Sequence, residues 1–397
     1  MPGIALVRAL EDDWRETLDA VARRRGWATS HEVARLAARV AALSLAYNDV
    51  RCARAGIREA GEARLGFWFA RDVPKGAAAV REFVAKGALP ASIRVLDVGA
   101  GLGAMTWGLV RALSAAGSRG GLVDATWLDE DGEALELGAS IARARARGRA
   151  GDVELRVQTV AQSADAPGAI GSFDVILVGQ VLSELTPGAS EQARVDQHAD
   201  LLRALAERVN DGGFLVVIEP ALRDRTRHLH RVRDALAPTI PIYAPCLHQA
   251  MCPALDRDTD WCHEDVRVDL PSWLIPVARA AGLRHQGLTF SYLVLRPGGG
   301  TLSEEIAVGA RGGRLRVVSD AIRTKGKHET FLCGDFAKAP EGAIVATRKR
   351  GVRLDRDRAP GNDAWSRLER GDVVVVDPAL DVERPRLGAT SLVRRVE

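Results

Sequence analysis

The sequence lacks the features that mark secreted, membrane-spanning or disordered proteins. It has five cysteines and no run of 18 or more uninterrupted apolar residues, so neither a disulfide framework nor a membrane span is expected. Apolar residues make up 47% of the chain, which is too hydrophobic for a disordered protein. The opening MPGIALVRALEDDWRE turns acidic before a signal-peptide core could develop. We therefore expect a cytoplasmic protein.

Lysine is scarce, since arginine supplies all but six of the 55 basic side chains. The net charge of +3 is too small to predict a nucleic-acid binder by itself, although arginine suits phosphate recognition. The basic side chains gather in two segments: Arg223, Arg225, Arg227, His228, His230, Arg231 and Arg233, and then Arg348, Lys349, Arg350 and Arg353. Such basic segments are either solvated helix faces or a binding surface for RNA phosphates, and the residues alone favour neither interpretation.

The 397 residues divide into four segments of different texture. Residues 1–88 have helical periodicity, and one helix is expected to follow Pro74 and end at Gly87. Residues 89–220 alternate short apolar strands with helices, which is typical of a doubly wound α/β sheet of the Rossmann-like kind. Residues 221–286 form a cysteine-rich region with three cysteines, loop-rich over residues 221–270, and residues 287–397 predict a small β domain.

The strongest motif is a glycine-rich turn between a strand and a helix. Asp97 and Val98 end an apolar strand, and Gly99, Ala100, Gly101, Leu102 and Gly103 lead into the helix. Glycines allow the turn and leave backbone N–H groups at the helix start free to contact a ligand. A turn of this kind also occurs for packing alone, but the preceding acid and the element order favour a nucleotide-type site.

The spacing G-x-G-x-G after Asp97 resembles class I S-adenosylmethionine methyltransferases and disfavours a nicotinamide oxidoreductase. In that family the glycines line the methionine end of the cofactor, and an acid at the end of the second strand binds the ribose. The resemblance places that acid at Asp129, with Glu130 or Asp131 as alternatives. It implies that S-adenosylmethionine is bound by Asp97, Gly99, Ala100, Gly101, Gly103 and Asp129.

The stretch SFDVILVGQVLSELT resembles the fourth strand of the same family and the turn that follows it. Gln180, Ser183 and Glu184 come at its carboxyl end, where cofactor or substrate is met, and we assign Gln180 to the cofactor site. Ser183 and Glu184 are equally well explained as a helix start. Neither of the common catalytic motifs of amino or pyrimidine-carbon methyltransferases follows the strand. The catalytic residues therefore stay unassigned.

Four of the cysteines are candidates for one metal site. Cys246, Cys252 and Cys262 lie within seventeen residues, and Cys333 follows in ETFLCGD. Thiolates select zinc or iron–sulfur clusters, and the spacing matches no standard zinc ribbon. One alternative is a zinc site with His248 or His263 as substitute ligands. The other is that the thiols are buried in the core and bind no metal. Cys52 is expected in a helix core and receives no role.

The string C-x-H-x-x-x-C-P, the following DWCH and the lone distal cysteine resemble the Rsm22 family, mitochondrial small-ribosomal-subunit assembly methyltransferase-like proteins and their bacterial relatives. RLGFWFARDVPKGAAAVREF, VLSEL and WSRLERGD extend the resemblance over most of the chain. It implies a 4Fe-4S cluster on Cys246, Cys252, Cys262 and Cys333. Leu247 replaces a common proline and Glu264 a common aromatic, and both substitutions leave the thiols in place.

The resemblance implies a protein that binds S-adenosylmethionine and a 4Fe-4S cluster and acts in small-ribosomal-subunit assembly. Its partner would be small-subunit ribosomal RNA or the assembling subunit. We expect it to bind neither DNA nor a membrane. It would either methylate the RNA or bind it as an assembly module, and the missing catalytic motif favours the module. The alternative is a zinc-containing methyltransferase with another RNA or a protein as substrate.

Overall fold

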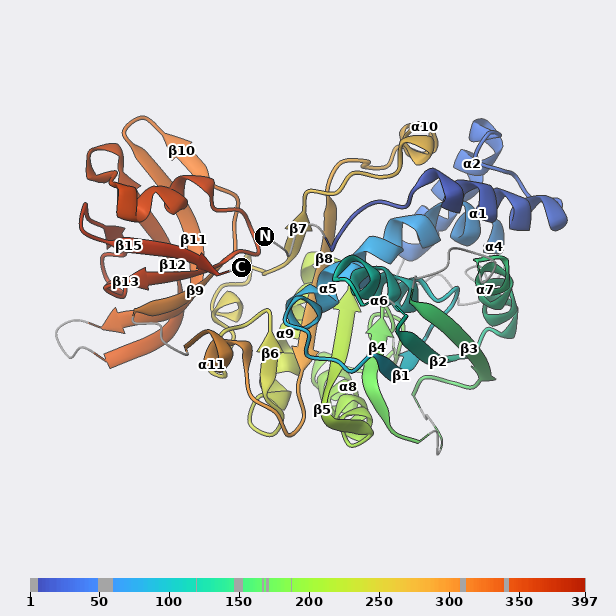
Figure 1. The fold of residues 1–397 in the computed structure, drawn as a ribbon, viewed down its shortest axis with the longest axis horizontal. Helices are drawn as coiled ribbons and strands as arrows, with labels where there is room; N and C mark the ends of the chain where they lie inside the picture. The colour runs from blue at the N-terminus through green and yellow to red at the C-terminus, as the bar shows by residue number, and fades with distance from the viewer. Residues whose placement is uncertain are drawn as a thin grey trace. The chain divides into compact units, whose positions relative to one another are not determined.

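The computed structural model describes residues 6–48, 60–118, 120–145, 153–165, 168, 171–186, 188–307, 312–338 and 343–396. The chain forms two compact units, and Figure 1 shows their helices and strands. Unit 1 consists of Met1–Ala189, Arg208–Ile218 and Arg267–Leu288. Unit 2 consists of Ser190–Glu207, Glu219–Val266 and Thr289–Glu397. The expected division into four segments stays a prediction.

Unit 1 is built on parallel strands in the order β3-β2-β1-β4-β5. The register of the middle strands places Val95 opposite Ala125 on one side and Val175 on the other. These runs are apolar on both faces because helices cover both faces of such a sheet. The strands are β1 Ser92–Val98, β2 Leu122–Asp129, β3 Glu154–Ala161, β4 Phe173–Gly179 and β5 Val209–Glu219. The α/β prediction is confirmed.

The helices α5 (Phe69–Ala85) and α6 (Ala104–Ala115) of unit 1 lie side by side in Figure 1. Two glycines allow their close approach. A Cβ atom on Gly76 would lie 2.8 Å from the Met105 carbonyl oxygen, and one on Gly108 would lie 2.5 Å from that of Val73. Side chains at either position would push the helices apart. Since α6 starts directly after the glycine-rich turn, this close approach fixes α5 relative to that turn.

The expected start of a helix after Pro74 is wrong. Helix α5 begins at Phe69 and contains the buried Pro74, and a π-helical turn, η1 (Arg64–Trp68), precedes it. Proline removes one backbone N–H and crowds the preceding turn, which is disfavoured inside a regular helix. The helix carries it just after the π-helical turn, where the hydrogen-bonding pattern changes.

Further helices of unit 1 are α1 Asp12–Arg24, α2 Val33–Asn48, α4 Gly61–Ala63, α7 Gly132–Arg145, the 3-10 turn η3 Ser272–Leu274 and α10 Ile275–Ala280. Helix α7 packs beside β2 and β3, α1 contacts α7, and α10 contacts α2. The helical prediction for the N-terminal segment is confirmed where the structure describes it. Nowhere in those described ranges does a helix have the length and apolar character needed to cross a membrane.

Unit 2 contains a mostly antiparallel sheet in the order β14-β12-β11-β9-β13-β15, with β10 beside β11. Its core is apolar and centres on Leu332, Phe336 and the fully buried Trp365. The predicted β tail is therefore present. Its strands are β9 Gly313–Val317, β10 Ile322–Thr324, β11 Lys327–Lys338, β12 Ala343–Leu354, β13 Val373–Asp377, β14 Arg386–Leu387 and β15 Leu392–Val396.

The remaining elements of unit 2 carry the cysteine-rich segment. They are α8 Glu191–Ala206, α9 Arg223–Leu236, β6 Ile242–Ala244, the 3-10 turn η2 Pro253–Leu255, β7 Glu264–Val266, β8 Leu288–Leu295 and α11 Leu302–Ala307. Strand β8 pairs with β6 and β7. The expected loop-rich start of this segment is wrong, since residues Arg223–Leu236 form the fourteen-residue helix α9. Helix α9 places Leu229, Val232 and Leu236 in the core among its many charges.

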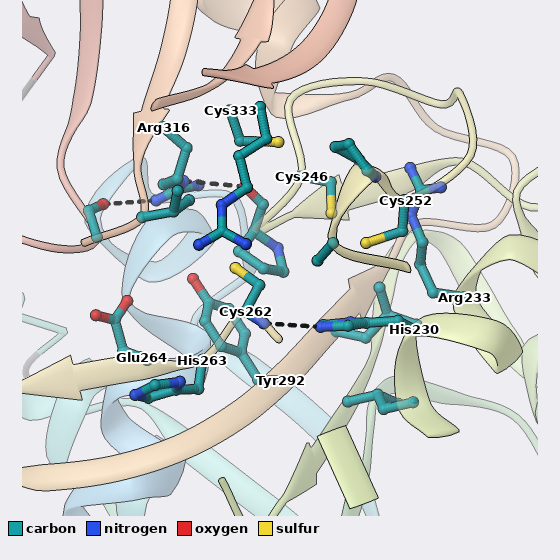
Figure 2. A pocket seen from close by; sticks show the side chains of 18 of the residues that line it. His230, Arg233, Cys246, Cys252, Cys262, His263, Glu264, Tyr292, Arg316 and Cys333 are labelled. Carbon is teal, nitrogen blue, oxygen red and sulfur yellow. Dashed lines mark hydrogen bonds between the residues drawn. The ribbon is translucent and has the colours of Figure 1, made fainter. Parts of the chain in front are cut away.

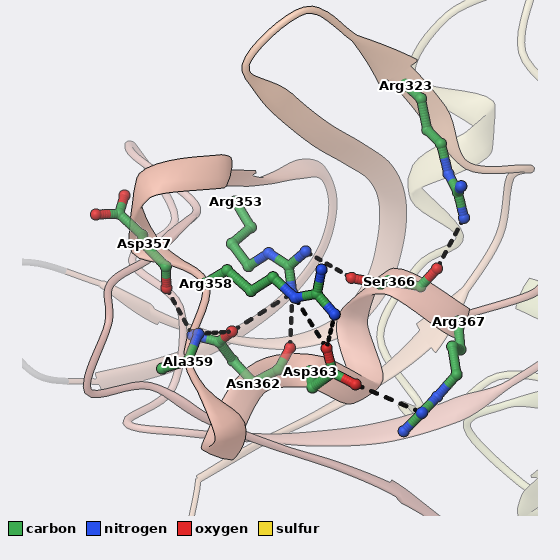
Figure 3. A network of polar contacts seen from close by, with 9 residues as sticks. All are labelled: Arg323, Arg353, Asp357, Arg358, Ala359, Asn362, Asp363, Ser366 and Arg367. Carbon is green, nitrogen blue, oxygen red and sulfur yellow. Dashed lines mark hydrogen bonds and ion pairs between the residues drawn. The ribbon is translucent and has the colours of Figure 1, made fainter.

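The WSRLERGD motif belongs to the framework of unit 2. It starts within η5 (Pro360–Arg367), which follows η4 (Asp355–Asp357). The Trp365 indole N–H donates to the His328 carbonyl at 3.2 Å, and the buried Arg353 donates to the Asn362 carbonyl at 2.9 Å and to the Ser366 hydroxyl at 2.6 Å. Figure 3 shows the polar part of this network. These bonds tie η5 to the neighbouring strands β11 and β12.

Candidate functional site

The glycine-rich turn of unit 1 has one open position. Gly99, Gly101 and Gly103 have φ values of +66°, +50° and +78°, a conformation that favours glycine. A Cβ atom on Gly99 would strike Val181, and one on Gly103 would strike Trp127, so packing accounts for both. A Cβ atom on Gly101 would meet nothing within 4 Å. Gly101 is therefore the position at which the backbone of the turn faces free space.

Asp129 lies at the end of β2 and contacts this turn. Its carboxylate accepts the N–H of Gly101 at 2.8 Å and that of Asp131 at 2.9 Å. Burial raises the pKa of Asp129, and the two backbone N–H groups lower it in part. The alternative acid Asp131 pairs instead with Arg64 at 3.1 Å. Of the two acids, Asp129 is thus the one held against the glycine-rich turn.

Asp97 lies beneath the turn and is 1% exposed. It accepts two hydrogen bonds from Thr106, from the backbone N–H at 3.1 Å and from the hydroxyl at 2.7 Å. The Thr106 hydroxyl in turn accepts the Trp127 indole N–H at 3.0 Å. Burial raises the pKa of Asp97 to about 7, and the Thr106 bonds oppose that rise. The contacts of Asp97 join β1 to the first turn of α6.

Gln180 follows β4 and has a strained backbone, with a φ of +62°. Its side-chain amide donates to the Asp72 carboxylate at 3.1 Å, and Asp72 pairs with Lys75 at 2.7 Å. Asp72 and Lys75 are both buried on α5. Ser183 is half-buried and Glu184 is exposed in the turn that follows. The structure thus joins the predicted Gln180 to a buried ion pair that sequence reasoning did not find.

The four predicted cysteines of unit 2 line one pocket, as Figure 2 shows. Cys246 follows β6, Cys252 precedes η2, Cys262 precedes β7, and Cys333 lies within β11. All four are free thiols. The pocket has a volume of about 50 Å³, several times the space that one water molecule needs. Cys52 lies outside the described residues.

One face of helix α9 holds the cysteine-bearing loops. Arg233 donates to the carbonyls of His248, at 2.6 Å, and Ala250, while Asp234 accepts the Cys252 N–H at 3.0 Å. One helical turn away, His230 accepts the Cys262 N–H at 3.1 Å. Arg227 donates to the backbone carbonyls of Ala254, Arg257 and Asp260. The loops between the cysteines therefore take their shape from α9.

This arrangement changes the interpretation of the first basic segment. Arg227, His228 and Arg233 are buried, at 6%, 7% and 2% exposure, and so do not face RNA phosphates. Sequence reasoning missed the scaffolding role of Arg227 and Arg233. The signal was present, because positions 227, 230, 233 and 234 recur every three to four residues and so share one helix face.

Cys333 lies in a row of three side chains across the sheet of unit 2. Strand pairing sets it opposite Arg316 of β9 and opposite Arg348 of β12. Arg316 donates to the Pro245 carbonyl at 2.9 Å, directly before Cys246. The Cys333 sulfur lies 3.5 Å from His248 Nε2. The sheet thus brings the distal cysteine to the segment that carries the first two.

The pocket favours neutral thiols and a neutral His230 imidazole when it holds only the protein's own groups. Burial raises the pKa of Cys262 to about 11 and raises those of Cys252 and Cys333 further, with the other cysteines adding to each rise. Burial and nearby arginines lower the pKa of His230 to about 3, so its ring accepts the Cys262 N–H as a neutral imidazole. A metal centre would have to displace the thiol protons.

The thiols are not arranged around a single ion. Within the described ranges, no group of three or more His, Cys, Asp or Glu side chains has the geometry to hold one metal ion. A tetrahedral zinc site needs four ligands about 2.0 to 2.3 Å from one centre. In a cubane cluster each thiolate binds a different iron, so the thiolates stand further apart. The predicted ligands thus share a pocket without forming a single-ion site.

The family assignment rests on most of the chain. The family described as mitochondrial small ribosomal subunit Rsm22 matches residues 77–365. The chain belongs to the Rsm22 family. The match includes the glycine-rich turn and all four cysteines of the pocket, and it confirms the resemblance inferred from the motifs. No curated protein matches the chain.

Several solved methyltransferase structures are distantly similar. A Listeria monocytogenes protein described as a class I S-adenosylmethionine-dependent methyltransferase is 13% identical, with a TM-score of 0.40, over 72% of this chain and 88% of its own. A methyltransferase homologue from Pyrococcus horikoshii is 15% identical, with a TM-score of 0.36, over 56% and 66%. TrmN from Thermus thermophilus is 17% identical, with a TM-score of 0.33, over 57% and 52%.

The raised pKa of Asp97 predicts a pH-dependent stability. Because the folded-state pKa is about 7 and the ordinary value is 3.8, the folded protein holds a proton there that the unfolded chain releases. The free energy of unfolding should fall between about pH 4 and 7, by up to about 1.4 kcal/mol per pH unit. Asp97→Asn should remove this component, as urea unfolding across that range would measure. Parallel pH profiles for wild type and variant would contradict the assignment.

Proposed function

We propose that the protein binds S-adenosylmethionine and a 4Fe-4S cluster and acts in assembly of the small ribosomal subunit, by binding or methylating its RNA. The family match carries this proposal, because one alignment over residues 77–365 includes both the glycine-rich turn and the four-cysteine pocket. The name of the family refers to the small ribosomal subunit. The proposed location is the cytoplasm.

The glycine-rich turn supports the cofactor part of the proposal. Gly101 offers an open backbone position, and Asp129 lies within hydrogen-bond distance of it. Each carboxylate oxygen keeps a second lone pair for a ribose hydroxyl. Gly99, Ala100 and Gly103 shape the turn, Asp97 anchors it to α6, and Gln180 lies at the end of the neighbouring strand. S-adenosylmethionine bound here would supply an electrophilic methyl group.

The pocket of unit 2 fits a cluster better than a single ion. Cys246, Cys252, Cys262 and Cys333 line it, and its volume is several times the space that one water molecule needs. Buried guanidinium groups also line it, so the surroundings suit a group that carries negative charge. Zinc, with His248 or His263 replacing a thiolate, is the alternative that metal analysis would decide.

The charge distribution supports an RNA partner. Residues 312–397 carry 18 Lys and Arg against 13 Asp and Glu, whereas the rest of the chain carries 37 against 39. The positive charge is thus concentrated in the C-terminal strands of unit 2. Arg358 and Arg367, which are 62% and 74% exposed, share the single carboxylate of Asp363 in Figure 3. Positive charge in excess of its partners is what phosphate contacts require.

A role as an assembly module agrees better with the turn after β4 than a role as a catalyst. The buried carboxylate that Gln180 contacts is Asp72, and Lys75 neutralises its charge at 2.7 Å. Neither common methyltransferase motif follows the strand. We therefore favour RNA binding as the main role, with methyl transfer as the outcome that would overturn this preference.

Gly101→Asn should weaken S-adenosylmethionine binding by at least about tenfold in calorimetry. Asparagine tolerates a positive φ, so the fold should persist while the new side chain occupies the open space above the turn. Gly87→Asn is the matched control, because Gly87 has a φ of +64° and also meets nothing within 4 Å, but lies after helix α5. Equal affinity in the two variants would refute the cofactor site.

Anaerobically purified protein should contain about four irons and four sulfides per chain, and Cys333→Ser should lose most of both. The chemical reason is that each thiolate binds one iron, and Ser is a poor substitute. Cys52→Ser, which changes the cysteine outside the described residues, is the control and should keep both. Stoichiometric zinc in a colourless preparation would decide for the zinc alternative.

The double variant Arg358→Gln/Arg367→Gln should bind small-subunit ribosomal RNA more weakly, with a salt dependence shallower by roughly one to two ions. Arg143→Gln/Arg156→Gln is the matched control, since those arginines are 64% and 63% exposed in unit 1 and each also pairs with a glutamate. Equal losses in both doubles would count against a specific RNA surface.

Mass spectrometry of small-subunit RNA from cells that carry only Gly101→Asn would separate the two roles. The module predicts unchanged methylation. A methyl group that is missing from the RNA of Gly101→Asn cells but present in the RNA of cells that carry only Gly87→Asn would show catalysis.

A further inference from the structure

Four arginines line the same pocket as the four cysteines. They are Arg233 of α9, Arg316 of β9, Arg348 of β12 and Arg370, which precedes β13. The side chains of Arg233, Arg348 and Arg370 are only 2%, 16% and 14% exposed. Burying a cation is costly unless an anion or a set of acceptors compensates it.

Carboxylates compensate two of these arginines only loosely. Arg348 lies 3.5 Å from the Asp260 carboxylate and Arg370 lies 3.7 Å from that of Asp320, and those acids are 39% and 70% exposed. Arg233 differs, because it pairs with the buried Asp234 at 2.6 Å. Arg348 and Arg370 therefore bring positive charge to the pocket that only partly screened acids offset.

The same arginines hold unused hydrogen-bond donors. The Nε atoms of Arg233, Arg348 and Arg370 are buried and have no hydrogen-bond partner among the described residues. The Nη1 atom of Arg370 already donates to the carbonyls of His263 and Val318. An unpaired buried donor destabilises the structure, so several around one pocket indicate an acceptor-rich, anionic occupant.

Arg348 and Arg370 lie on the side of Cys262 and Cys333. Arg348 is directly opposite Cys333 in the β11–β12 ladder, so the two side chains project from the same face of the sheet. Arg370 donates to the carbonyl of His263, the residue after Cys262, at 3.4 Å. In Figure 2, Cys262 and Cys333 border the hollow together with Arg316.

We propose that Arg348 and Arg370 are positioning residues for the cluster, whose guanidinium N–H groups bond its sulfur atoms beside Cys262 and Cys333 and raise its reduction potential. This inference rests on the proposed function, since it requires the cluster. Reduction adds one negative charge to the cluster, and neighbouring positive charge and hydrogen bonds to sulfur favour the reduced form. Arg348 and Arg370 would therefore influence the reduction potential of the cluster as well as the affinity of the protein for it.

The test is an anaerobic reductive titration of the full chain, followed by electron paramagnetic resonance. Arg348→Gln and Arg370→Gln should each lower the midpoint potential, and the double variant should lower it further. Arg350→Gln is the matched control: it lies two positions along β12, is 52% exposed and does not line the pocket, so its potential should equal that of wild type. Iron content and circular dichroism would verify equal loading and folding.

Arg348→Lys and Arg370→Lys keep the charge but lose the planar donor, and should shift the potential in the same direction by less. If a glutamine variant fails to bind iron, the potential of the corresponding lysine variant is measured in its place. Unchanged potentials in the loaded variants, next to a wild type with a full cluster, would overturn this inference and leave the proposed function intact. A wild type that holds zinc and no iron would overturn the cluster itself and this inference with it.

Discussion

Hydrogen bonds from buried cationic side chains to backbone carbonyls are the constraint on which the cysteine pocket depends. The segment from Cys246 to Cys262 has little regular structure of its own, so its backbone groups need partners from outside. Helix α9 provides such partners through Arg227, His230, Arg233 and Asp234, and Arg316 of the sheet binds the Pro245 carbonyl just before the segment. Because a guanidinium group has five donors in a fixed plane, one arginine can hold two or three carbonyls at once. Lysine, which this sequence scarcely uses, lacks that geometry.

Side chains also hold the glycine-rich turn in place through hydrogen bonds. Its glycines serve different purposes: Gly99 and Gly103 make room for Val181 and Trp127, and Gly101 leaves the backbone accessible. Asp97 reaches α6 through Thr106, while Asp129 holds the N–H of Gly101. The two aspartates thus have different roles: Asp97 binds Thr106 of α6, and Asp129 binds the backbone of the turn itself.

Sequence reasoning predicted what local patterns encode. The apolar runs around Val95 and Val175 gave the parallel strands, and the spacing of the four cysteines gave one shared pocket. It failed where a residue's role depends on a distant partner. Arg233 looked like part of a basic run that either is solvated or faces RNA, because its acceptors, the carbonyls of His248 and Ala250, cannot be recognised from the neighbouring sequence. Pro74 looked like a helix start because the π-helical turn that accommodates it has no simple sequence pattern. The Asp72–Lys75 pair needs the close approach of α5 and α6 to bring it to Gln180.

Strand β11 belongs to two environments at once. Leu332 and Phe336 face the apolar core, while Phe331 and Cys333 belong to the opposite face, where Cys333 borders the pocket. Side chains alternate along a strand, so inserting one residue before Phe331 would exchange the two sets. Cys333 would then enter the core and Leu332 would take its place in the pocket wall. Changes of length in this strand should therefore be far less tolerated during evolution than changes of side chain, and they should be confined to its ends.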